Sequence, residues 1–333
     1  MEQTRETLPR VISGMRPTGA LHIGHYHGAL ANWLRLQETH DCFFFVADLH
    51  ALTNAQPSRE QMEHNVYEMV VDWLAAGIDP ERTTLFVQSR LPEHAELFTL
   101  LAMDTPLSWL ERVPTFKELA AEKPTEKPSY GLLGYPLLQA ADILIHKAGL
   151  VPVGEDQQAH VEFAREVARR FNHRHGAVFP EPQSLLTPTP RVPGLDGRKM
   201  SKSLGNGIAM REAPELVAEQ IRTMPTDPQR VRRTDAGEPA RCPVWALHEI
   251  HVDAATRESL ATGCRTAGIG CLDCKQPLID AVVQLQAPWR ERAAELAADT
   301  RKVHWLLELG SERARAVARK TLKEVRAAMG LSY

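Results

Sequence analysis

The stretch that decides the fold is VISGMRPTGALHIGH, which runs from Val11 to His25. A short apolar run comes first, glycine and proline breakers follow, and apolar residues at helical spacing then continue as far as Leu36. Strand, turn and helix in this order are typical of a parallel sheet, where the helix begins at the carboxyl edge of the strands. Because the first N–H groups of a helix are free and its dipole is positive there, the stretch predicts an anion-binding site.

Further apolar runs extend this pattern along the chain. We expect the buried strands to include residues 11–12, 43–47, 84–88 and 151–153, with amphipathic helices between them. The alternation predicts an α/β fold, a Rossmann-like doubly wound parallel sheet, over residues 1–205. The proline-interrupted segment at about 93–135 is expected to be a helical insertion at the crossover of the sheet. Only helical patterns follow, which predicts an α-helical domain over residues 206–333.

Two histidines, His22 and His25, flank Ile23 and Gly24 at the expected helix start. Three residues apart on one helical face, they can donate hydrogen bonds to phosphate oxygens as pyrophosphate leaves. Gly24 would leave room for a purine or a phosphate to approach the backbone. An isolated pair of this kind more often lies on the surface or binds a metal, so the turn context carries the prediction.

A second string, Lys199-Met200-Ser201-Lys202-Ser203, lies in a glycine-flanked stretch without apolar periodicity. We expect a mobile loop whose two lysines stabilise the negative charge that grows on the phosphates in the transition state. A solvated linker is the usual meaning of such a run. Together with the histidine string, however, it indicates an enzyme that activates a substrate with ATP.

These two strings are the signature motifs of the class I aminoacyl-tRNA synthetases, and the chain resembles that family from about Val11 to its C-terminus. The blocks between them resemble the tryptophanyl branch, in order: ADLHALT at 47–53, YPLLQAADIL at 135–144 and VPVGEDQ at 151–157. The resemblance implies that L-tryptophan reacts with MgATP to give tryptophanyl-AMP and pyrophosphate. The tryptophanyl group then passes to the 3′ end of tRNA(Trp). A tyrosyl enzyme shares the architecture and is the less favoured alternative.

The resemblance also implies roles for individual residues. Catalysis is expected from His22, His25, Lys199 and Lys202. ATP contacts are expected from Arg16, Pro17, Thr18, Gly24, His25, Gly154, Glu155, Asp156, Val192, Lys199, Met200, Ser201, Lys202 and Ser203. Tyrosine, aspartate and glutamine side chains are expected to bind tryptophan, namely Tyr135, Asp142 and Gln157. Many relatives have Gln at the place of Arg16, and Lys117 is a further phosphate candidate.

Asp142 is a carboxylate in an otherwise apolar helical run, and such a group needs a hydrogen-bond donor. An indole N–H is one, and a site built on that bond rejects phenylalanine because the carboxylate is then left unpaired. Pairing with Lys147 explains the pattern equally well. The family resemblance favours substrate binding.

Four of the five cysteines follow residue 205, namely Cys242, Cys264, Cys271 and Cys274, whereas Cys42 is expected to be buried beside a strand. Their spacing does not form two CxxC pairs of a zinc ribbon. A subset of the family has a similar pattern, which implies a 4Fe-4S cluster, with zinc as the alternative. Four unconnected thiols remain a third interpretation.

Composition limits the remaining possibilities. The net charge of −3 argues against a surface that coats nucleic acid generally. Local basic candidates for tRNA are the loop at 226–235 and the last helix with Arg313, Arg315, Arg319, Lys320, Lys323 and Arg326, although several of the latter suit a solvated face. No signal peptide or long apolar run occurs, so we expect a soluble, cytoplasmic enzyme without membrane contact. By the family resemblance it is a homodimer that uses the insertion for its contacts.

Two other function classes explain part of the pattern. A small-molecule nucleotidylyltransferase would account for the nucleotide motifs but not for a helical domain with four cysteines. A paralogue repurposed as an RNA-binding or redox-sensing module would retain the pockets. The intact histidine and lysine strings count against lost chemistry.

Overall fold

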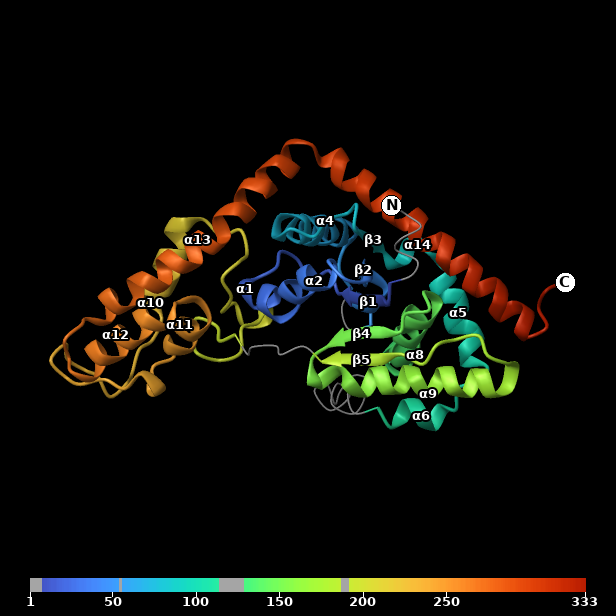
Figure 1. Ribbon diagram of the computed structural model, residues 1–333, viewed down its shortest axis with the longest axis horizontal. Coiled ribbons are helices and arrows are strands. Elements are labelled where there is room, and N and C mark those ends of the chain that lie inside the picture. Colours follow the sequence, from blue (N-terminus) through green and yellow to red (C-terminus); the bar gives the residue numbers. More distant parts are fainter. Residues whose placement is uncertain (1–7, 54–55, 114–128, 187–191) are drawn as a thin grey trace.

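The computed structural model describes residues 8–53, 56–113, 129–186 and 192–333. Its centre is a five-stranded, fully parallel sheet in the order β3-β2-β1-β4-β5 (Figure 1). The strands are β1 Arg10–Met15, β2 Asp41–Val46, β3 Thr83–Val87, β4 Leu150–Val153 and β5 Gln183–Leu186. The predicted doubly wound sheet is therefore confirmed, and the chain reverses its direction of winding between β1 and β4.

The sequence pattern missed only one strand, β5. Strand β2 is apolar over Cys42–Val46 and buried on both faces, which is the pattern of a central parallel strand. In contrast, Gln183 and Leu186 at the two ends of β5 are exposed. An edge strand of four residues with exposed ends carries too little periodicity to be recognised.

Helices cover the sheet and begin where the sequence supplies caps. Ser58 forms a capping box with Gln61 at the start of α4, and Gly77 ends that helix with a φ of 112°. After β1 the chain forms α1, a π-helical turn η2 and α2. The elements of this half are α1 Ile23–His25, η2 Tyr26–Leu30, α2 Ala31–Leu36, α3 Asp48–Ala51, α4 Arg59–Ala76, η3 Gln88–Arg90, η4 Glu155–Gln157 and α9 Gln158–His175.

The insertion consists of helices in its described part. They are α5 Pro92–Ala102, α6 Leu107–Glu111 and the first turns of α8 Tyr130–Ile145. Pro106 caps α6, in agreement with the expected break. Lys117 lies outside the described residues.

All regular elements in the described residues beyond Leu186 are helices. This agrees with the helical patterns of the sequence. The helices are η5 Lys202–Leu204, α10 Pro214–Thr223, η6 Pro239–Arg241, α11 Trp245–His251, α12 Ala254–Arg265, α13 Cys271–Ala298 and α14 Thr300–Ala328. The long helices α13 and α14 meet at an angle (Figure 1). Helix α13 packs against the small helices at one end of the molecule, and α14 packs against the sheet at the other.

Helix α14 returns to the sheet and covers its β3 edge. A Cβ atom at Gly310 would lie 1.8 Å from the backbone oxygen of Leu85, so only glycine permits this contact. Covering the edge protects the unpaired backbone groups of β3. None of the helices in the described part of the chain is long and apolar enough to span a membrane.

The basic residues of α14 largely face this interface. Arg315 donates to the backbone oxygen of Arg90, while Arg319 and Arg326 pair with Glu93 and Glu96. Arg313 donates to the backbone oxygen of Pro80. These contacts join α14 to the sheet half, and a role of the exposed Arg319 and Arg326 in binding tRNA stays a prediction.

Candidate active site

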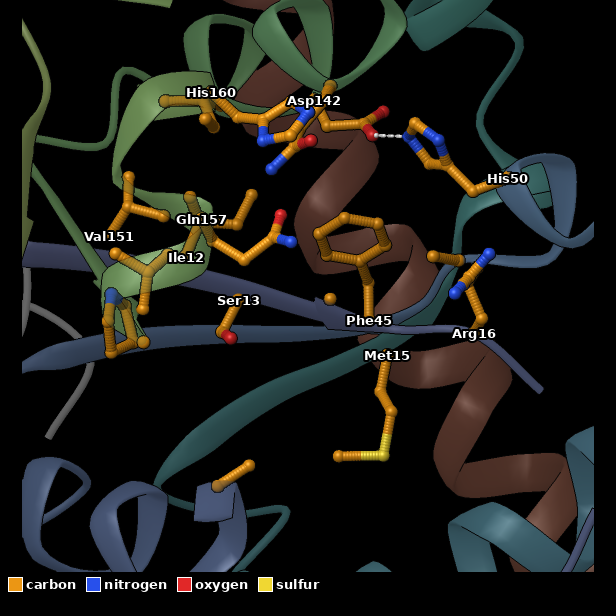
Figure 2. A pocket seen from close by; sticks show the side chains of 18 of the residues that line it. Ile12, Ser13, Met15, Arg16, Phe45, His50, Asp142, Val151, Gln157 and His160 are labelled. Carbon is orange, nitrogen blue, oxygen red and sulfur yellow. Dashed lines mark hydrogen bonds and ion pairs between the residues drawn. The ribbon is translucent and has the colours of Figure 1, made fainter. Parts of the chain in front are cut away.

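A cavity of about 480 Å³ opens at the carboxyl ends of β1 and β4, where the winding of the sheet reverses (Figure 2). Its wall combines the ends of these two strands with side chains of α8 and with the turn η2. Predicted site residues that line it are Arg16, Tyr135, Asp142, Gly154 and Gln157. The parallel topology brings them together from three separate stretches of the sequence.

The floor of this cavity depends on one glycine. A Cβ atom at Gly14 would lie 2.4 Å from Cζ of Phe45, so the Phe45 ring lies directly over the backbone of β1. Figure 2 shows that ring in the middle of the cavity, between Gln157 and Arg16. The pair provides an apolar surface on which a flat aromatic ligand can lie.

Asp142 is the buried anion of the cavity, with only 1% of its surface exposed. Its oxygens accept hydrogen bonds from His50 Nε2 at 2.8 Å, from His94 Nδ1 at 2.7 Å and from Gln88 Nε2 at 2.8 and 3.0 Å. Burial alone would raise the pKa of Asp142, but the bonds from His50 and His94 outweigh it and hold that pKa at about 2. The carboxylate is therefore ionised. The alternative partner, Lys147, pairs with Glu324 instead.

Sequence reasoning did not identify these donors. His50 is part of the ADLHALT block, whereas Gln88 and His94 follow β3 in a stretch without a recognised motif. A buried carboxylate demands donors, but nothing in the sequence says which elements supply them.

His160 is a further cavity residue that sequence reasoning missed. Its Nε2 lies 2.8 Å from the hydroxyl of Tyr135, and burial lowers its pKa. This contact fixes the Tyr135 hydroxyl at the cavity wall, close to Gln157 on η4. These three polar groups lie on the wall of one cavity.

The histidine and lysine strings meet beside the cavity. A Cβ atom at Gly24 would lie 2.8 Å from Nδ1 of His22 and 3.4 Å from Sδ of Met200. Gly24 therefore makes room for the two strings to approach each other. His22 also forms a β-bridge with Ala209, just beyond the lysine string.

Lys202 points back into the turn before the first helix. Its Nζ donates to the backbone oxygen of Gly19 at 2.6 Å and to Oγ1 of Thr18 at 3.1 Å. Burial lowers its pKa to about 8. A half-buried ammonium group at this turn is suited to binding a phosphate.

The two histidines of the first string are neutral at neutral pH. Burial lowers the pKa of His22 to about 4 and that of His25 to about 3, with further contributions from the nearby positive charge of Lys202. The backbone N–H of His22 donates to Nδ1 of His25 at 3.2 Å. Nδ1 of His25 is therefore unprotonated, and its Nε2–H remains as the hydrogen-bond donor.

A buried carboxylate, Asp72, binds residues near each of the two strings. Oδ2 of Asp72 accepts the backbone N–H of Leu21 at 2.7 Å, and Oδ1 accepts Nε of Arg211 at 2.5 Å. Asn206 closes the lysine loop by accepting the amide of Ser201 and donating to Asp196. The loop is thus held against the helix start by packed, hydrogen-bonded contacts.

The remaining predicted ATP residues differ in their contacts and their burial. The carbonyl of Val192 accepts the amide of Met200, and the hydroxyls of Ser201 and Ser203 lie 2.9 Å apart. Pro17 is buried in the turn after β1. The side chains of Glu155, Asp156 and Lys199 are exposed.

The four cysteines of the helical part are partly buried free thiols. Burial is the main cause that raises the pKa of Cys274, and the negative charges of the Cys242, Cys264 and Cys271 thiolates raise it further, to about 12. Among the described residues, however, no group of three potential ligands is close enough to hold a metal ion. The described residues therefore show neither the predicted 4Fe-4S site nor the zinc site that is its alternative.

A doubly wound sheet whose switch point faces an anion-binding helix start and a lysine loop defines a class of ATP-dependent enzymes that form adenylates. Comparison with known proteins identifies the family within this class. The chain belongs to the family "tRNA synthetases class I (W and Y)", which matches residues 4–286.

The similar proteins agree with this assignment. A tryptophan–tRNA ligase of Ralstonia nicotianae is 50% identical over 97% of this chain and 99% of its own length. The corresponding ligase of Thermotoga maritima is 48% identical over 97% and 100%. A crystal structure of tryptophanyl-tRNA synthetase from Campylobacter jejuni, complexed with ADP and tryptophan, superimposes with a TM-score of 0.88 at 32% identity and covers 97% and 100%.

Proposed function

We infer that the chain is a tryptophan–tRNA ligase that uses MgATP. The observation that carries this inference is the buried, ionised Asp142 on the wall of an aromatic-floored cavity, in a chain that matches tryptophan–tRNA ligases over its whole length. A buried carboxylate is suited to accept an indole N–H. The alternatives, a repurposed RNA-binding or redox-sensing paralogue and a tyrosyl enzyme, gain no support from the similar proteins.

In the first step, the indole lies on Phe45 with its N–H toward Asp142. Tyr135 and Gln157 hold the polar end of tryptophan so that its carboxylate faces the α-phosphorus of MgATP. The phosphates lie against the helix start, where His25 donates from Nε2 and Gly24 exposes its backbone. Arg16, Gly154, Glu155, Asp156 and Val192 surround the nucleotide.

Pyrophosphate departs toward the lysine loop. The carboxylate oxygen forms a bond to the α-phosphorus while the bond between that phosphorus and the bridging oxygen breaks. Lys199 and Lys202 stabilise the charge that develops on the leaving group. The terminal ribose hydroxyl of tRNA(Trp) then attacks the tryptophanyl carbonyl and releases AMP. No side-chain nucleophile takes part.

The decisive experiment is ATP–pyrophosphate exchange with tryptophan, with tyrosine and without an amino acid, followed by charging of tRNA. Exchange that requires tryptophan, together with charging of tRNA(Trp), is the expected result. Exchange without charging would identify a paralogue that has lost tRNA transfer, and exchange with tyrosine would identify a tyrosyl enzyme.

Binding of tRNA is assigned to the exposed loop before α11. Arg232 and Arg233 are exposed, and the amide of Arg232 is fixed by Asp235 at 2.6 Å. We expect the Arg232→Glu/Arg233→Glu variant to lower kcat/KM for tRNA roughly tenfold or more, because two phosphate-binding charges are reversed. ATP–pyrophosphate exchange should stay unchanged. The matched control is Arg59→Glu, an exposed arginine on α4, and equal loss of both activities in the double variant would contradict the assignment.

The homodimer is assigned to the insertion. Met103 and Leu107 are 70% and 57% exposed, and Tyr130 at the start of α8 is 65% exposed. Large apolar side chains gathered in this way mark an interaction surface. In sedimentation velocity we expect the Met103→Asp/Leu107→Asp variant to be a monomer under conditions in which the wild type and Leu331→Asp are dimers. A wild-type monomer would refute the proposal.

The cysteine quartet is assigned to a 4Fe-4S cluster on the number and type of its donors, four thiols, although the described residues form no group close enough to hold a metal ion. An anaerobic preparation should contain about four iron and four sulfide per chain and show a visible absorption band. One zinc and no iron under these conditions would refute the cluster.

A cytoplasmic location remains a prediction.

A further inference from the structure

Asp142 has no hydrogen-bonding position left for a substrate. An ionised carboxylate offers about four lone-pair positions. Oδ1 accepts from His94 and Gln88, and Oδ2 accepts from His50 and Gln88, so four contacts are already made. An indole N–H that binds here must therefore replace one of them.

Both the nitrogen and the oxygen of the Gln88 side-chain amide form hydrogen bonds, and the side chain lies behind the cavity wall. Its Nε2 donates to Asp142, and its Oε1 accepts the backbone N–H of Leu49 at 3.2 Å. The side chain is completely buried and does not line the cavity. Losing its bond would leave a buried amide donor without a partner.

His94 is equally fixed, by a second histidine. Its Nδ1 donates to Asp142, and its Nε2 lies 3.1 Å from Nε2 of His146. Nδ1 of the buried His146 has no partner in the described part of the chain, and burial lowers the pKa of that imidazole. The two rings lie within hydrogen-bond distance of each other, so His146 holds His94 in place from the protein side.

His50 is the only one of the three donors that lies on the cavity wall. It belongs to α3, a helix of four residues, and 11% of its side chain is exposed. In Figure 2 it approaches Asp142 from the opposite side to Gln157 and His160, next to Arg16. A ligand that enters the cavity reaches Asp142 at the oxygen that His50 occupies.

We propose that His50 is a specificity-determining residue, whose hydrogen bond to Asp142 is exchanged for that of the indole N–H when tryptophan binds. This inference rests on the proposed function. Gln88 and His94 keep the carboxylate in place, and only the donor at Oδ2 changes. A ligand without the N–H leaves His50 on Asp142, so the pocket stays in its ligand-free arrangement.

The exchange has a measurable thermodynamic consequence. In the wild type, the gain from the indole bond is offset by loss of the His50 bond. Removing the His50 donor abolishes that offset, so the variant should distinguish more sharply between tryptophan and an analogue without the N–H. The probe is 3-benzothienyl-L-alanine, in which sulfur replaces the indole N–H, and the readout is the ratio of its Kd to that of tryptophan.

We expect this ratio to rise about tenfold in His50→Phe, which keeps a ring but has no donor. His94→Phe is the matched control, since that donor is retained in both complexes and its loss should not raise the ratio. A ratio in His50→Phe that is unchanged or lower would overturn the proposal. It would mean that the forked bond of Gln88 moves onto Oδ1 and makes room beside His50.

Crystal structures of the wild-type complexes test the same point without a variant. With tryptophan, the distance between His50 Nε2 and Asp142 Oδ2 should exceed 3.5 Å, the limit for a hydrogen bond. With the benzothienyl analogue it should remain near the 2.8 Å of the structure described above. An intact contact in the tryptophan complex would refute the exchange. Absence of tryptophan-dependent pyrophosphate exchange in the wild type would instead refute the proposed function.

Discussion

Replacing Lys202 with methionine is expected to lower kcat for tryptophan-dependent ATP–pyrophosphate exchange by about 100- to 1,000-fold, the cost of losing one transition-state donor. Lys202 is the loop cation that reaches the turn before the first helix, at Gly19 and Thr18. Phosphates that bind at this helix start meet its ammonium group, and the negative charge there grows as pyrophosphate leaves. The measurement is steady-state exchange with tryptophan and ATP varied independently.

The tryptophan pocket is separate from this contact, so the Kd for tryptophan alone should not change in Lys202→Met. Lys323→Met is the control, because Lys323 is an exposed lysine of α14. If the variant kept full kcat, the contacts of Lys202 with Gly19 and Thr18 would serve only to hold the loop in place.

The pH dependence follows from the same side chain. Burial lowers the pKa of Lys202 to about 8, so its ammonium form predominates below that pH and declines above it. In the free enzyme, kcat/KM for ATP should therefore be level near pH 7 and fall as the pH rises through 8. The fall should be absent in Lys202→Met, which has no group to titrate. His22 and His25, with pKa values of about 4 and 3, stay neutral throughout this range.

The second large effect is expected for Asp142→Asn, which should lower kcat/KM for tryptophan by about 100-fold or more. Asparagine retains one acceptor oxygen but presents an NH₂ group to donors. Those donors, His50, His94 and Gln88, would then face another donor in a site with 1% exposure. The variant therefore loses the negative charge that binds the indole N–H, and it loses hydrogen bonds that hold His50, His94 and Gln88 around this position.

The measurement is exchange kinetics with saturating ATP, combined with thermal unfolding, since the mismatch also lowers stability. Asp280→Asn is the control, because Asp280 is an exposed aspartate of α13 that accepts a bond from Gln276. Near-normal kcat/KM in folded Asp142→Asn would exclude the carboxylate as the indole acceptor.

The sequence predicted the parts of the fold that have local causes. Four of the five strands were recognised because their apolar runs alternate with helical patterns and end near breakers, as in Cys42–Val46. The helix start after β1 was recognised because glycine, proline and two histidines interrupt the apolar pattern there. Strand β5 was not, because its ends are exposed and its four residues lack a period.

Contacts between distant segments were beyond prediction. The sequence placed a carboxylate at Asp142 and required donors for it, but His50, Gln88 and His94 come from α3, η3 and α5. The arginines of α14 suggested a solvated or RNA-binding face, and the structure adds ion pairs of Arg319 with Glu93 and of Arg326 with Glu96 that the spacing did not predict. In both cases, a charged residue shows that a partner is needed and not where the partner is.

The sequence by itself determined the chemistry, through the two strings at His22–His25 and Lys199–Ser203 and the blocks between them, because each needs only its local order of residues. The tertiary structure alone decided how these pieces act together. It brought Met200 against Gly24 and Lys202 against Gly19, and surrounded Asp142 with three donors. The physical reason is that hydrogen-bond satisfaction and close packing depend on which surfaces meet when the parallel sheet closes, and spacing along the chain does not record that.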